Sequence, residues 1–288
     1  MKTYFECVQY IKNELVNHYP EGEITGFISI IFYHLENLSL SQLNLKYKDS
    51  IKTETIQNIE YIVSELKENK PIQYIIGETE FFSLKFRVNA NVLIPRPETE
   101  ELVDWIVKDF IHFKNLRVLD IGSGSGCIAI SLSKNLDCHN VNGFEISSGA
   151  IRASKINAKL NGVKVKFFKK NILKIFQKIY KKKYDIIVSN PPYVTQKEKE
   201  LMHKNVLNYE PHTALFVEDD NPLVFYKTIA EFAKNNLKAY GCLYFEINEK
   251  FGTQIFNLLL GEKFNTVILR KDINGKDRMI KAILKADE

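Results

Sequence analysis

The sequence contains few of the features that mark secreted, metal-binding or membrane-spanning proteins. Its four cysteines, Cys7, Cys127, Cys138 and Cys242, are scattered and form no Cys-x-x-Cys pair. This spacing argues against a zinc motif or a disulfide framework and favours a reducing compartment. No apolar run approaches the roughly 18 residues of a membrane span, and the N-terminus lacks the pattern of a signal peptide. We therefore expect a cytoplasmic protein without a bound metal and without membrane contact.

The remaining composition is that of an ordinary globular protein with a mild basic excess. Of the 288 residues, 45% are hydrophobic and 26% are charged, and the net charge is +5. This length allows one large domain or two smaller ones. A basic run can contact nucleic acid, but it is more often a solvated surface, which is the interpretation we adopt. Much of the excess lies in one such run, made of Lys164, Lys166, Lys169, Lys170, Lys174, Lys178 and Lys181 to Lys183.

Residues 1–72 predict a small helical domain. Apolar residues recur at helical spacing in Phe5–Leu15 and Ile56–Leu66, and Ile24–Leu38 is apolar enough to be the central helix of a bundle. A Thr-Glu pair at residues 53–54 offers capping chemistry for the last helix. No residue in this region suggests catalysis. A helical domain placed before a catalytic one is usually a lid or a surface that docks a partner, and we expect this one to dock the substrate.

Residues 73–95 predict a linker that contains a β-hairpin. Within it, Tyr74–Val92 alternates apolar and polar residues, with Gly77 and Ser83 at possible turns. A stretch of prolines and acids follows the hairpin. The prolines stiffen the chain, and the acids place negative charge in the first turn of a helix, where the helix dipole favours it. Helix-start chemistry alone accounts for these residues, so the catalytic domain is expected to span residues 96–288.

The rest of the chain predicts an α/β fold. Strand and helix patterns alternate from Leu116 onward, which indicates a mostly parallel sheet with helices on both faces. The last two strand candidates have too little chain between them for a crossover helix, so they are expected to pair antiparallel around Asn274-Gly275. The seven candidate strands are Arg117–Ile121, Val141–Ile146, Val163–Phe168, Tyr184–Val188, Leu243–Ile247, Phe264–Leu269 and Arg278–Leu284.

A glycine-rich turn follows the first of these strands and precedes a helix predicted at Cys127–Leu132. The turn reads Gly122-Ser123-Gly124-Ser125-Gly126, and Glu145 ends the next strand about 20 residues later. In Rossmann-like units an acid at that place binds the ribose hydroxyls of a nucleoside cofactor. The spacing is not that of a dinucleotide loop, and no P-loop lysine follows. These features favour S-adenosylmethionine, which needs the ribose acid but no pyrophosphate site.

A second motif, Ser189-Asn190-Pro191-Pro192-Tyr193, follows the buried strand candidate Tyr184–Val188. The two prolines cannot donate to a sheet ladder, so they end the strand in stiff, extended backbone. An amide carbonyl, a backbone carbonyl and an aromatic face are thereby presented together, which suits a planar –NH₂ group. Asn-Pro is also a common turn opener, so a simple strand-ending turn is the alternative. Beside a methyl donor, the motif predicts methylation of an amide or an exocyclic amine.

Nearly end to end, the chain resembles the bacterial release-factor glutamine methyltransferases, which modify the glutamine of a Gly-Gly-Gln motif. Asn-Pro-Pro-Tyr by itself is weakly specific, because DNA amino-methyltransferases share it. Its combination with Arg96-Pro97-Glu98-Thr99-Glu100 and the helical N-terminal region is specific, and it favours this branch over a relative that methylates a ribosomal protein. The stretches that carry the resemblance are Leu93–Val103, Val118–Ser131, Asp185–Tyr193, Tyr209–Leu215 and Asp272–Arg278.

The resemblance implies a class I S-adenosylmethionine-dependent methyltransferase that acts on class-1 peptide chain release factors. The sequence does not give the oligomeric state, and a monomer is our expectation. The resemblance also implies that Asn190 and the Pro191 carbonyl hold the glutamine amide while Tyr193 packs against it. Substrate contacts are implied for Asn190, Pro191, Pro192, Tyr193, Arg96, Glu98 and Thr99, and cofactor contacts for Gly122, Ser123, Gly124, Ser125, Gly126, Glu145, Asn171, Ile172 and Asn190.

Three positions depart from the family pattern. Glu145 stands where the family more often has Asp, and it can still accept hydrogen bonds from the ribose hydroxyls. Asn171 stands where the family commonly has an acid, and its carbonyl can still accept a hydrogen bond from the adenine amine. Asn248 stands where glycine is expected, and the sequence offers no reason for it. The sequence does not mark His203 or His212 as a catalytic residue, and both are interpreted as surface or loop residues. Catalysis is therefore expected to depend on positioning and electrostatics rather than on a covalent intermediate.

Two other functions compete with this interpretation. A nucleic-acid adenine or cytosine amino-methyltransferase would account for Asn-Pro-Pro-Tyr and the lysine run, but it would need a base-flipping pocket and a basic face. No separate target-recognition domain is evident, so we expect the protein not to bind nucleic acid. A cofactor-binding docking module without turnover would account for the departures at Asn171 and Asn248. The complete Asn-Pro-Pro-Tyr motif favours an active enzyme.

Overall fold

The computed structural model describes residues 1–175, 177–179, 183–262 and 264–285. They form two compact units, one made of Met1–Gly77 with His203–Tyr209 and the other of the rest of the described chain. The domain limits inferred from the sequence, at 1–72, 73–95 and 96–288, remain a proposal about how the chain divides its functions. The two units are described separately below.

The first unit is a bundle of helices around one apolar core. The core side chains are spaced at helical intervals, so each helix turns one apolar stripe inward. Thr53, predicted to cap a helix, is instead its first residue, and the preceding Lys52 makes no capping bond through its side chain. The helices of the bundle are α1 (Tyr4–Leu15), α2 (Glu21–Glu36), α3 (Leu40–Leu45), α4 (Thr53–Lys67) and α5 (Ile72–Ile76). Helix α10 (Lys204–Tyr209), from far along the chain, is grouped with this unit but contributes no buried residue to its core.

The predicted hairpin is present but shorter than the sequence pattern indicated. Strands β1 (Glu78–Phe81) and β2 (Leu84–Arg87) pair antiparallel, and the two residues between them take positive φ angles of 49° and 59°. The prediction was wrong for Tyr74–Ile76, which belong to helix α5. Pro71 starts that helix and Gly77 ends it in the left-handed conformation, so the strand can begin only afterwards.

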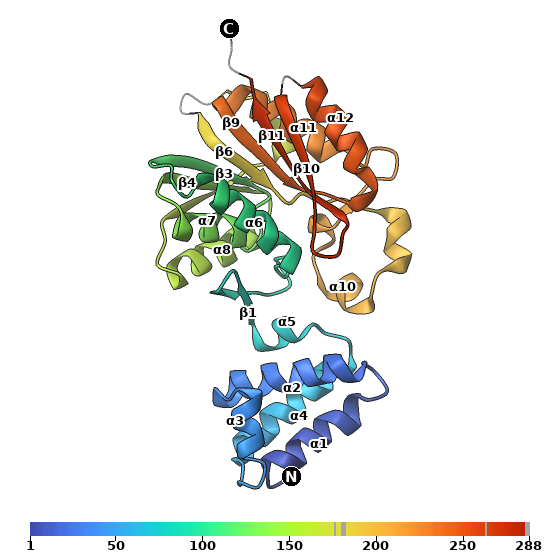
Figure 1. Ribbon diagram of the computed structural model, residues 1–288. Helices are drawn as coiled ribbons and strands as arrows, with labels where there is room; N and C mark the ends of the chain where they lie inside the picture. Colours follow the sequence, from blue (N-terminus) through green and yellow to red (C-terminus); the bar gives the residue numbers. More distant parts are fainter. Residues whose placement is uncertain (176, 180–182, 263, 286–288) are drawn as a thin grey trace. The chain divides into compact units, whose positions relative to one another are not determined.

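A seven-stranded sheet forms the centre of the second unit, as predicted. Its order is β10-β11-β9-β6-β3-β4-β5, and β11 runs antiparallel to both of its neighbours while the other pairs are parallel (Figure 1). The strands are β3 (Leu116–Ile121), β4 (Cys138–Glu145), β5 (Val165–Lys169), β6 (Tyr184–Ser189), β9 (Leu237–Glu246), β10 (Phe264–Lys271) and β11 (Asp277–Leu284).

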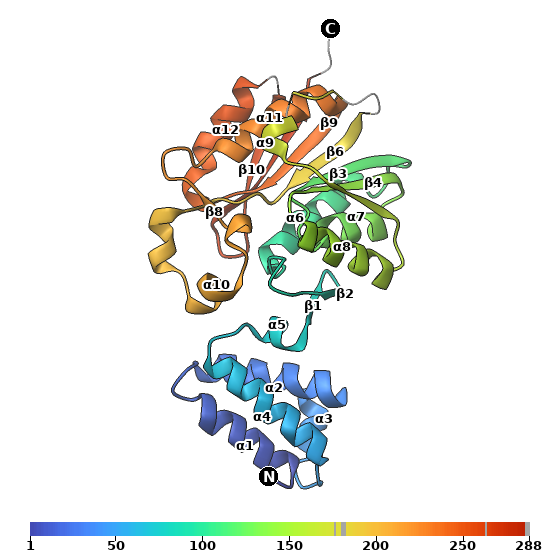
Figure 2. The same cartoon turned by 180° about the vertical axis from the view of Figure 1, so that it is seen from behind.

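Helices cover both faces of this sheet, so two apolar cores form, one on each side. Helices α6, α7 and α8 pack on one face, and α9, α11 and α12 pack on the other (Figures 1 and 2). The helices are α6 (Pro97–Phe110), α7 (Cys127–Asn135), α8 (Ser148–Leu160), α9 (Ile172–Ile175), α11 (Val224–Asn236) and α12 (Gly252–Gly261). Two short strands, β7 (Val194–Thr195) and β8 (Phe216–Val217), pair outside the sheet.

Strand limits agree with the sequence prediction to within a few residues, except at β9. This strand begins at Leu237, six residues before the predicted Leu243, although Tyr240 takes a positive φ of 60°. The irregular backbone breaks the apolar alternation there, and the register with β6 shifts at the same place. The sequence pattern therefore marks only the regular, fully buried half of the strand.

Candidate functional site

A cavity of about 330 Å³ opens at the carboxyl ends of the parallel strands. The chain adds β4 and β5 on one side of β3, and β6 and β9 on the other. The point between β3 and β6 is therefore the switch point, where open α/β sheets bind their ligands. Gly122 follows β3 and Asn190 follows β6, and both line the cavity. The volume falls in the range of small-molecule sites.

The glycine-rich turn after β3 forms one wall of the cavity. The backbone N–H groups of Gly122 and Ser123 donate to the Phe144 carbonyl at 2.8 and 3.1 Å, which fixes the turn against the end of β4. Gly122, Gly124 and Gly126 have φ angles of 76°, 53° and 83°, a region that side chains with a Cβ atom disfavour. Gly122 and Gly124 line the cavity, whereas Gly126 lies behind it at the start of α7.

Two substitutions are expected to distinguish Gly126, which packs behind the cavity, from Gly124, which lines it. At Gly126 a Cβ atom would lie 2.9 Å from Ile130 and 3.1 Å from Phe167, so Gly126→Ala adds a clash to the unfavourable φ and is expected to lower stability by ~2–3 kcal/mol. At Gly124 the nearest atom is 3.9 Å away, so Gly124→Ala is expected to cost only ~1 kcal/mol. Urea unfolding of both variants measures the difference. Equal stability of the two would contradict the packing argument.

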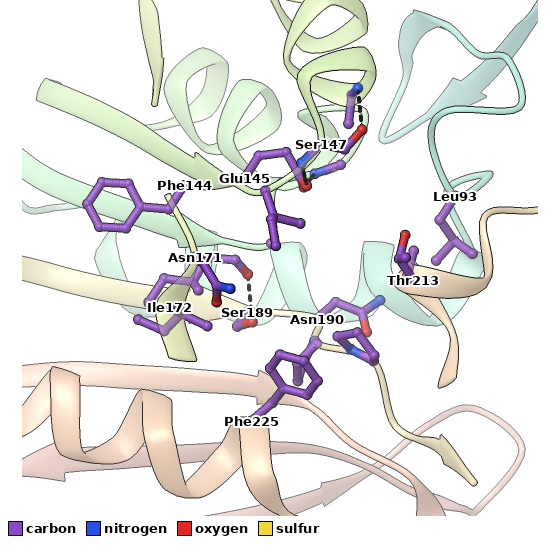
Figure 3. A pocket seen from close by; sticks show the side chains of 18 of the residues that line it. Leu93, Phe144, Glu145, Ser147, Asn171, Ile172, Ser189, Asn190, Thr213 and Phe225 are labelled. Carbon is purple, nitrogen blue, oxygen red and sulfur yellow. Dashed lines mark hydrogen bonds between the residues drawn. The ribbon is translucent and has the colours of Figure 1, made fainter. Parts of the chain in front are cut away.

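Glu145, at the end of β4, fixes the same turn and faces the cavity. One carboxylate oxygen accepts from the Gly124 N–H at 2.9 Å, and the other accepts from the Ser147 N–H at 2.8 Å (Figure 3). The residue is 9% exposed and lines the cavity, and each of its oxygens can accept a further hydrogen bond. An anionic acceptor thus stands beside the glycine turn, as the ribose interpretation requires.

The end of β5 and helix α11 supply the apolar part of the cavity. Ile172 and Phe225 line it together with Asn171, whose side-chain oxygen accepts from the Leu173 N–H at 3.0 Å (Figure 3). That bond holds the Asn171 carbonyl at the start of α9 and leaves its amide group available. Apolar side chains with polar groups beside them suit a heteroaromatic ring.

The Asn-Pro-Pro-Tyr motif forms another part of the cavity wall, next to the glycine-rich turn. Ser189 donates its hydroxyl hydrogen to the Ile121 carbonyl at 2.6 Å, which ties the end of β6 to the end of β3. Asn190, Pro191 and Pro192 line the cavity directly after this anchor. The Asn190 amide nitrogen donates to the Thr99 hydroxyl at 3.3 Å. The motif is thus a rigid element held from both sides, and not a solvated turn.

Tyr193 points away from the cavity into a buried polar cluster. Its hydroxyl donates to Glu246 at 3.0 Å, and Thr99 donates to the other oxygen of the same carboxylate at 2.6 Å. Glu246 is 1% exposed. Burial raises the pKa of the Glu246 carboxyl, while the hydrogen bonds from Thr99 and Tyr193 and the charge of Arg278 oppose that rise. Burial also raises the pKa of the Tyr193 hydroxyl, so this group is a hydrogen-bond donor at neutral pH.

Glu210 joins two segments that line the cavity from distant parts of the sequence. It is 4% exposed and accepts from the Ile94 N–H at 3.2 Å and from the Arg96 guanidinium. Leu93 precedes this contact, and Pro211 follows Glu210; both residues line the cavity. Arg96 therefore acts in this structure as the partner of a buried carboxylate, with its side chain 32% exposed.

The structure gives a reason for Asn248, the departure that the sequence left unexplained. Its amide nitrogen donates to the Tyr193 carbonyl at 3.2 Å and to the Glu198 carboxylate at 3.1 Å. Its side-chain oxygen accepts from the Lys250 N–H at 3.0 Å. Glycine could make none of these bonds. Asn248 thus ties the backbone after the second proline to the loop that follows β9.

Asp120, in the middle of the sheet below the glycine turn, predicts a pH dependence of stability. It is fully buried, and only one of its oxygens has a hydrogen-bond partner, the Ala129 N–H at 3.3 Å. Burial raises the pKa of the Asp120 carboxyl to about 7, the Ala129 hydrogen bond opposes the rise, and Glu145 adds to it. In the unfolded chain this carboxyl titrates near pH 4, about the ordinary value for Asp.

Between about pH 4 and pH 7 the folded protein therefore binds more protons at Asp120 than the unfolded chain does. The stabilising contribution of Asp120 is fully present below about pH 4 and is lost as the pH rises to about 7. Above about pH 7 it does not change further. We expect Asp120→Asn to remove this slope, so that the variant gains on the wild type as the pH rises. Urea unfolding of the wild type and of Asp120→Asn at pH 5 and pH 8 measures this pH dependence. Parallel pH profiles of the two proteins would contradict its assignment to Asp120.

The cavity wall contains about half of the residues that the sequence assigned to the site. It includes Gly122, Gly124, Glu145, Asn171, Ile172, Asn190, Pro191 and Pro192. Ser123, Ser125, Gly126 and Thr99 are buried behind it, Tyr193 faces Glu246, and Arg96 and Glu98 lie at the start of α6. Their contacts with bound molecules stay predictions. No role was predicted from the sequence for Leu93, Phe144, Phe225, Glu210 or Glu246. Of these, only Leu93 and Glu210 lie in stretches that carry the family resemblance.

Other predicted features lie outside this site. The lysine run is exposed at six positions, while Lys170 is half-buried beside the cavity and Lys181 and Lys182 lie outside the described residues. His203 and His212 are exposed, as predicted. All four cysteines are free. Within the described residues, no helix is long and apolar enough to span a membrane, and no cluster of side chains could hold a metal ion.

Comparisons with known proteins agree with this geometry. A family model described as "Methyltransferase small domain" matches residues 99–214. A release factor glutamine methyltransferase from Flavobacterium psychrophilum is 49% identical over 93% of this chain and 94% of its own length. One from Bacteroides thetaiotaomicron is 42% identical over 95% and 97% of the two chains. Among solved structures, a methyltransferase from Pyrococcus furiosus superposes with a TM-score of 0.52 at 17% identity, over 82% of this chain and all of its own, and supports the fold.

Proposed function

The chain belongs to the release factor glutamine methyltransferases, and from this premise we propose its reaction, substrate and cofactor. It transfers a methyl group from S-adenosylmethionine to the side-chain amide nitrogen of the glutamine in the Gly-Gly-Gln motif of class-1 peptide chain release factors, which supports translation termination. The observation that carries this proposal is that Asn190 and Pro191 line the same cavity as Gly122 and Glu145. A wall suited to an amide thus adjoins a wall suited to a nucleoside.

The cavity residues fit S-adenosylmethionine. Gly122 and Gly124 expose backbone without side chains, so a ligand can approach closely. Glu145 offers carboxylate oxygens for the ribose hydroxyls, and Ile172 with Asn171 offers an apolar face and an amide for the adenine. When bound, this group supplies a methyl group on positively charged sulfur, which leaves as a neutral thioether once the methyl is transferred.

Asn190 and Pro191 are proposed to hold the substrate amide. The Asn190 side-chain oxygen and the Pro191 carbonyl each accept one hydrogen of the glutamine –NH₂. Pro191 is buried, its own ring fixes φ and the proline that follows restricts its ψ, so the carbonyl direction is set before the substrate binds. Pro192 limits the backbone in the same way, and Tyr193 extends the motif toward the buried carboxylate. These acceptors distinguish an amide, whose –NH₂ group donates hydrogen bonds to them, from a carboxylate, whose negative oxygens they repel.

Catalysis then depends on placement and charge. An amide nitrogen is a weak nucleophile because its lone pair is delocalised into the carbonyl. Fixing both N–H groups turns the lone-pair face toward the methyl donor, and a fixed approach replaces a rare collision. The same two acceptors stabilise the positive charge that develops on nitrogen during transfer. The proton leaves to water afterwards, when the methylated nitrogen has become strongly acidic.

Several further parts of the proposal concern partners. The helical domain, residues 1–72, docks the release factor, and residues 73–95 link it to the catalytic domain, residues 96–288. Exposed apolar side chains on the helical unit support docking, because such groups are used in protein contacts; they include Val16, Tyr33, Leu45 and Tyr61. We also propose that the enzyme acts in the cytoplasm, as a monomer, and without binding nucleic acid.

One experiment tests the proposed function against its alternatives. Labelled S-adenosylmethionine is offered with a purified class-1 release factor, with duplex DNA and with buffer alone, and mass spectrometry locates the label. Label on the Gly-Gly-Gln glutamine side chain is the expected result. Label on DNA would indicate instead that the Asn-Pro-Pro-Tyr motif binds the amino group of a base. Cofactor binding without any transfer would favour a docking module.

A further inference from the structure

A buried hydrogen-bonded chain runs behind the amide of Asn190. It passes from the Asn190 amide nitrogen to the Thr99 hydroxyl at 3.3 Å, and from that hydroxyl to Glu246 at 2.6 Å. Thr99 lies in the first turn of α6 and Glu246 is the last residue of β9, so two distant elements meet beneath the motif. Thr99 is 2% exposed and Glu246 is 1% exposed. Neither residue lines the cavity.

The chemistry of these groups gives the chain a direction. An ionised carboxylate can only accept hydrogen bonds, and a threonine hydroxyl has a single hydrogen to donate. At 2.6 Å from Glu246, the Thr99 hydrogen is committed to the carboxylate. The Thr99 oxygen then has only lone pairs to offer Asn190, so it accepts from the amide –NH₂. The side-chain oxygen of Asn190 is consequently the amide atom that remains available to the cavity.

The surroundings of Glu246 keep it an acceptor. Tyr193 donates to its other oxygen at 3.0 Å, and the positive charge of Arg278 favours the anion. Arg278 is itself fixed by Asp272 at 3.1 Å and by the Ile247 carbonyl at 3.3 Å. Burial raises the pKa of Glu246, and the hydrogen bonds from Thr99 and Tyr193 and the charge of Arg278 oppose that rise. The carboxylate is therefore a fixed end point from which the orientation of Asn190 is set.

We propose that Thr99, held by Glu246, positions the Asn190 amide so that its carbonyl oxygen faces the reacting –NH₂ group. This inference rests on the proposed function and adds two residues to it. An asparagine amide has nearly the same shape after a half-turn about its last side-chain bond, but its donor and acceptor exchange places. In the reversed orientation Asn190 would present N–H groups to an –NH₂ substrate. Thr99 and Glu246 are thus positioning residues that help to select an amide over a carboxylate.

The first variant is Thr99→Val, which nearly keeps the shape of the side chain and removes the hydroxyl. Asn190 then loses the acceptor that fixes its amide, and the reversed orientation becomes populated. We expect kcat for release-factor methylation to fall ~10–100-fold, the size of effect seen when a polar group loses its buried partner. The Kd for S-adenosylmethionine is expected to stay near the wild-type value. Thr99→Ser restores the hydroxyl and is expected to restore most of kcat.

A double variant separates positioning from a general loss of structure. If Thr99 acts through Asn190, then Thr99→Val has no further effect on kcat once Asn190 is alanine, because the two substitutions remove one shared interaction. Additive losses would overturn the proposal. Thr228→Val is a matched control, since Thr228 is a half-buried threonine of the catalytic unit that does not line the cavity, and its hydroxyl donates to the Val224 carbonyl at 2.7 Å. It is expected to leave kcat unchanged.

A spectroscopic measurement tests the orientation without relying on activity. The side-chain amide signal of Asn190 is assigned in a ¹⁵N-labelled protein by its absence from Asn190→Ala. Its hydrogens are expected to exchange slowly in the wild type and in Thr99→Ser, and rapidly in Thr99→Val. Equal exchange in all three would overturn the proposal even if the wild type methylates release factor. A wild type that fails to methylate, with the exchange differences present, would instead reject the proposed function and keep the orientation.

Discussion

Replacing Asn190 with alanine is expected to slow methyl transfer ~10²–10³-fold, the loss found when one preorganised polar group is removed from an active site. Asn190 supplies an acceptor at the place where charge develops, and its backbone continues directly from the Ser189 anchor. Because that anchor and the glycine turn remain, cofactor binding is expected to fall far less. Single-turnover rates at saturating S-adenosylmethionine, together with calorimetric binding, measure the two effects separately.

The control for this variant is Asn235→Ala, on helix α11. Asn235 is also half-buried, and its amide donates to the Glu231 carbonyl of its own helix at 3.1 Å. Its removal is expected to leave the transfer rate at the wild-type value. Activity of Asn190→Ala within a few-fold of the wild type would remove Asn190 from the mechanism. Equal losses of rate and of cofactor affinity would assign it to the cofactor instead.

Replacing Glu145 with alanine is expected to raise the Kd for S-adenosylmethionine ~10²-fold or more, because hydrogen bonds to a charged group contribute ~1.5–3 kcal/mol each. The carboxylate would bind the ribose, and it also holds the Gly124 and Ser147 N–H groups at 2.9 and 2.8 Å. Removing it therefore weakens the contact and loosens the turn. In steady-state kinetics, KM for the methyl donor is expected to rise with kcat largely kept.

Two milder variants at the same position separate charge from shape. Glu145→Gln keeps one acceptor oxygen but has no charge, and we expect an intermediate affinity. Glu145→Asp keeps the charge on a shorter side chain and is expected to bind nearest to the wild type. Thermal unfolding of all three variants shows whether the loosened turn lowers stability. Unchanged affinity in Glu145→Ala would exclude the ribose contact and leave Glu145 a purely structural residue.

The local parts of this site could be predicted from the sequence. Prolines, glycines and apolar runs act on their own backbone, so β6 followed by Asn190, and β3 followed by Gly122, were recognisable as strands ending in special turns. The antiparallel pairing of β10 with β11 followed from the short connection between them. By contrast, Tyr74–Ile76 was predicted as strand, because a few apolar residues fit either period and the choice was made by the flanking Pro71 and Gly77.

The sequence by itself determined which backbone forms the two walls, because those properties belong to neighbouring residues. Only the tertiary structure decided what stands behind the walls. Thr99 and Glu246 lie 147 positions apart, and Ile94 and Glu210 lie 116 positions apart. Neither pair leaves a periodic signal, because a hydrogen bond between distant elements depends on how the sheet orders its strands. The same ordering brings Gly122 and Asn190 to one cavity, and it turns two local motifs into a single site.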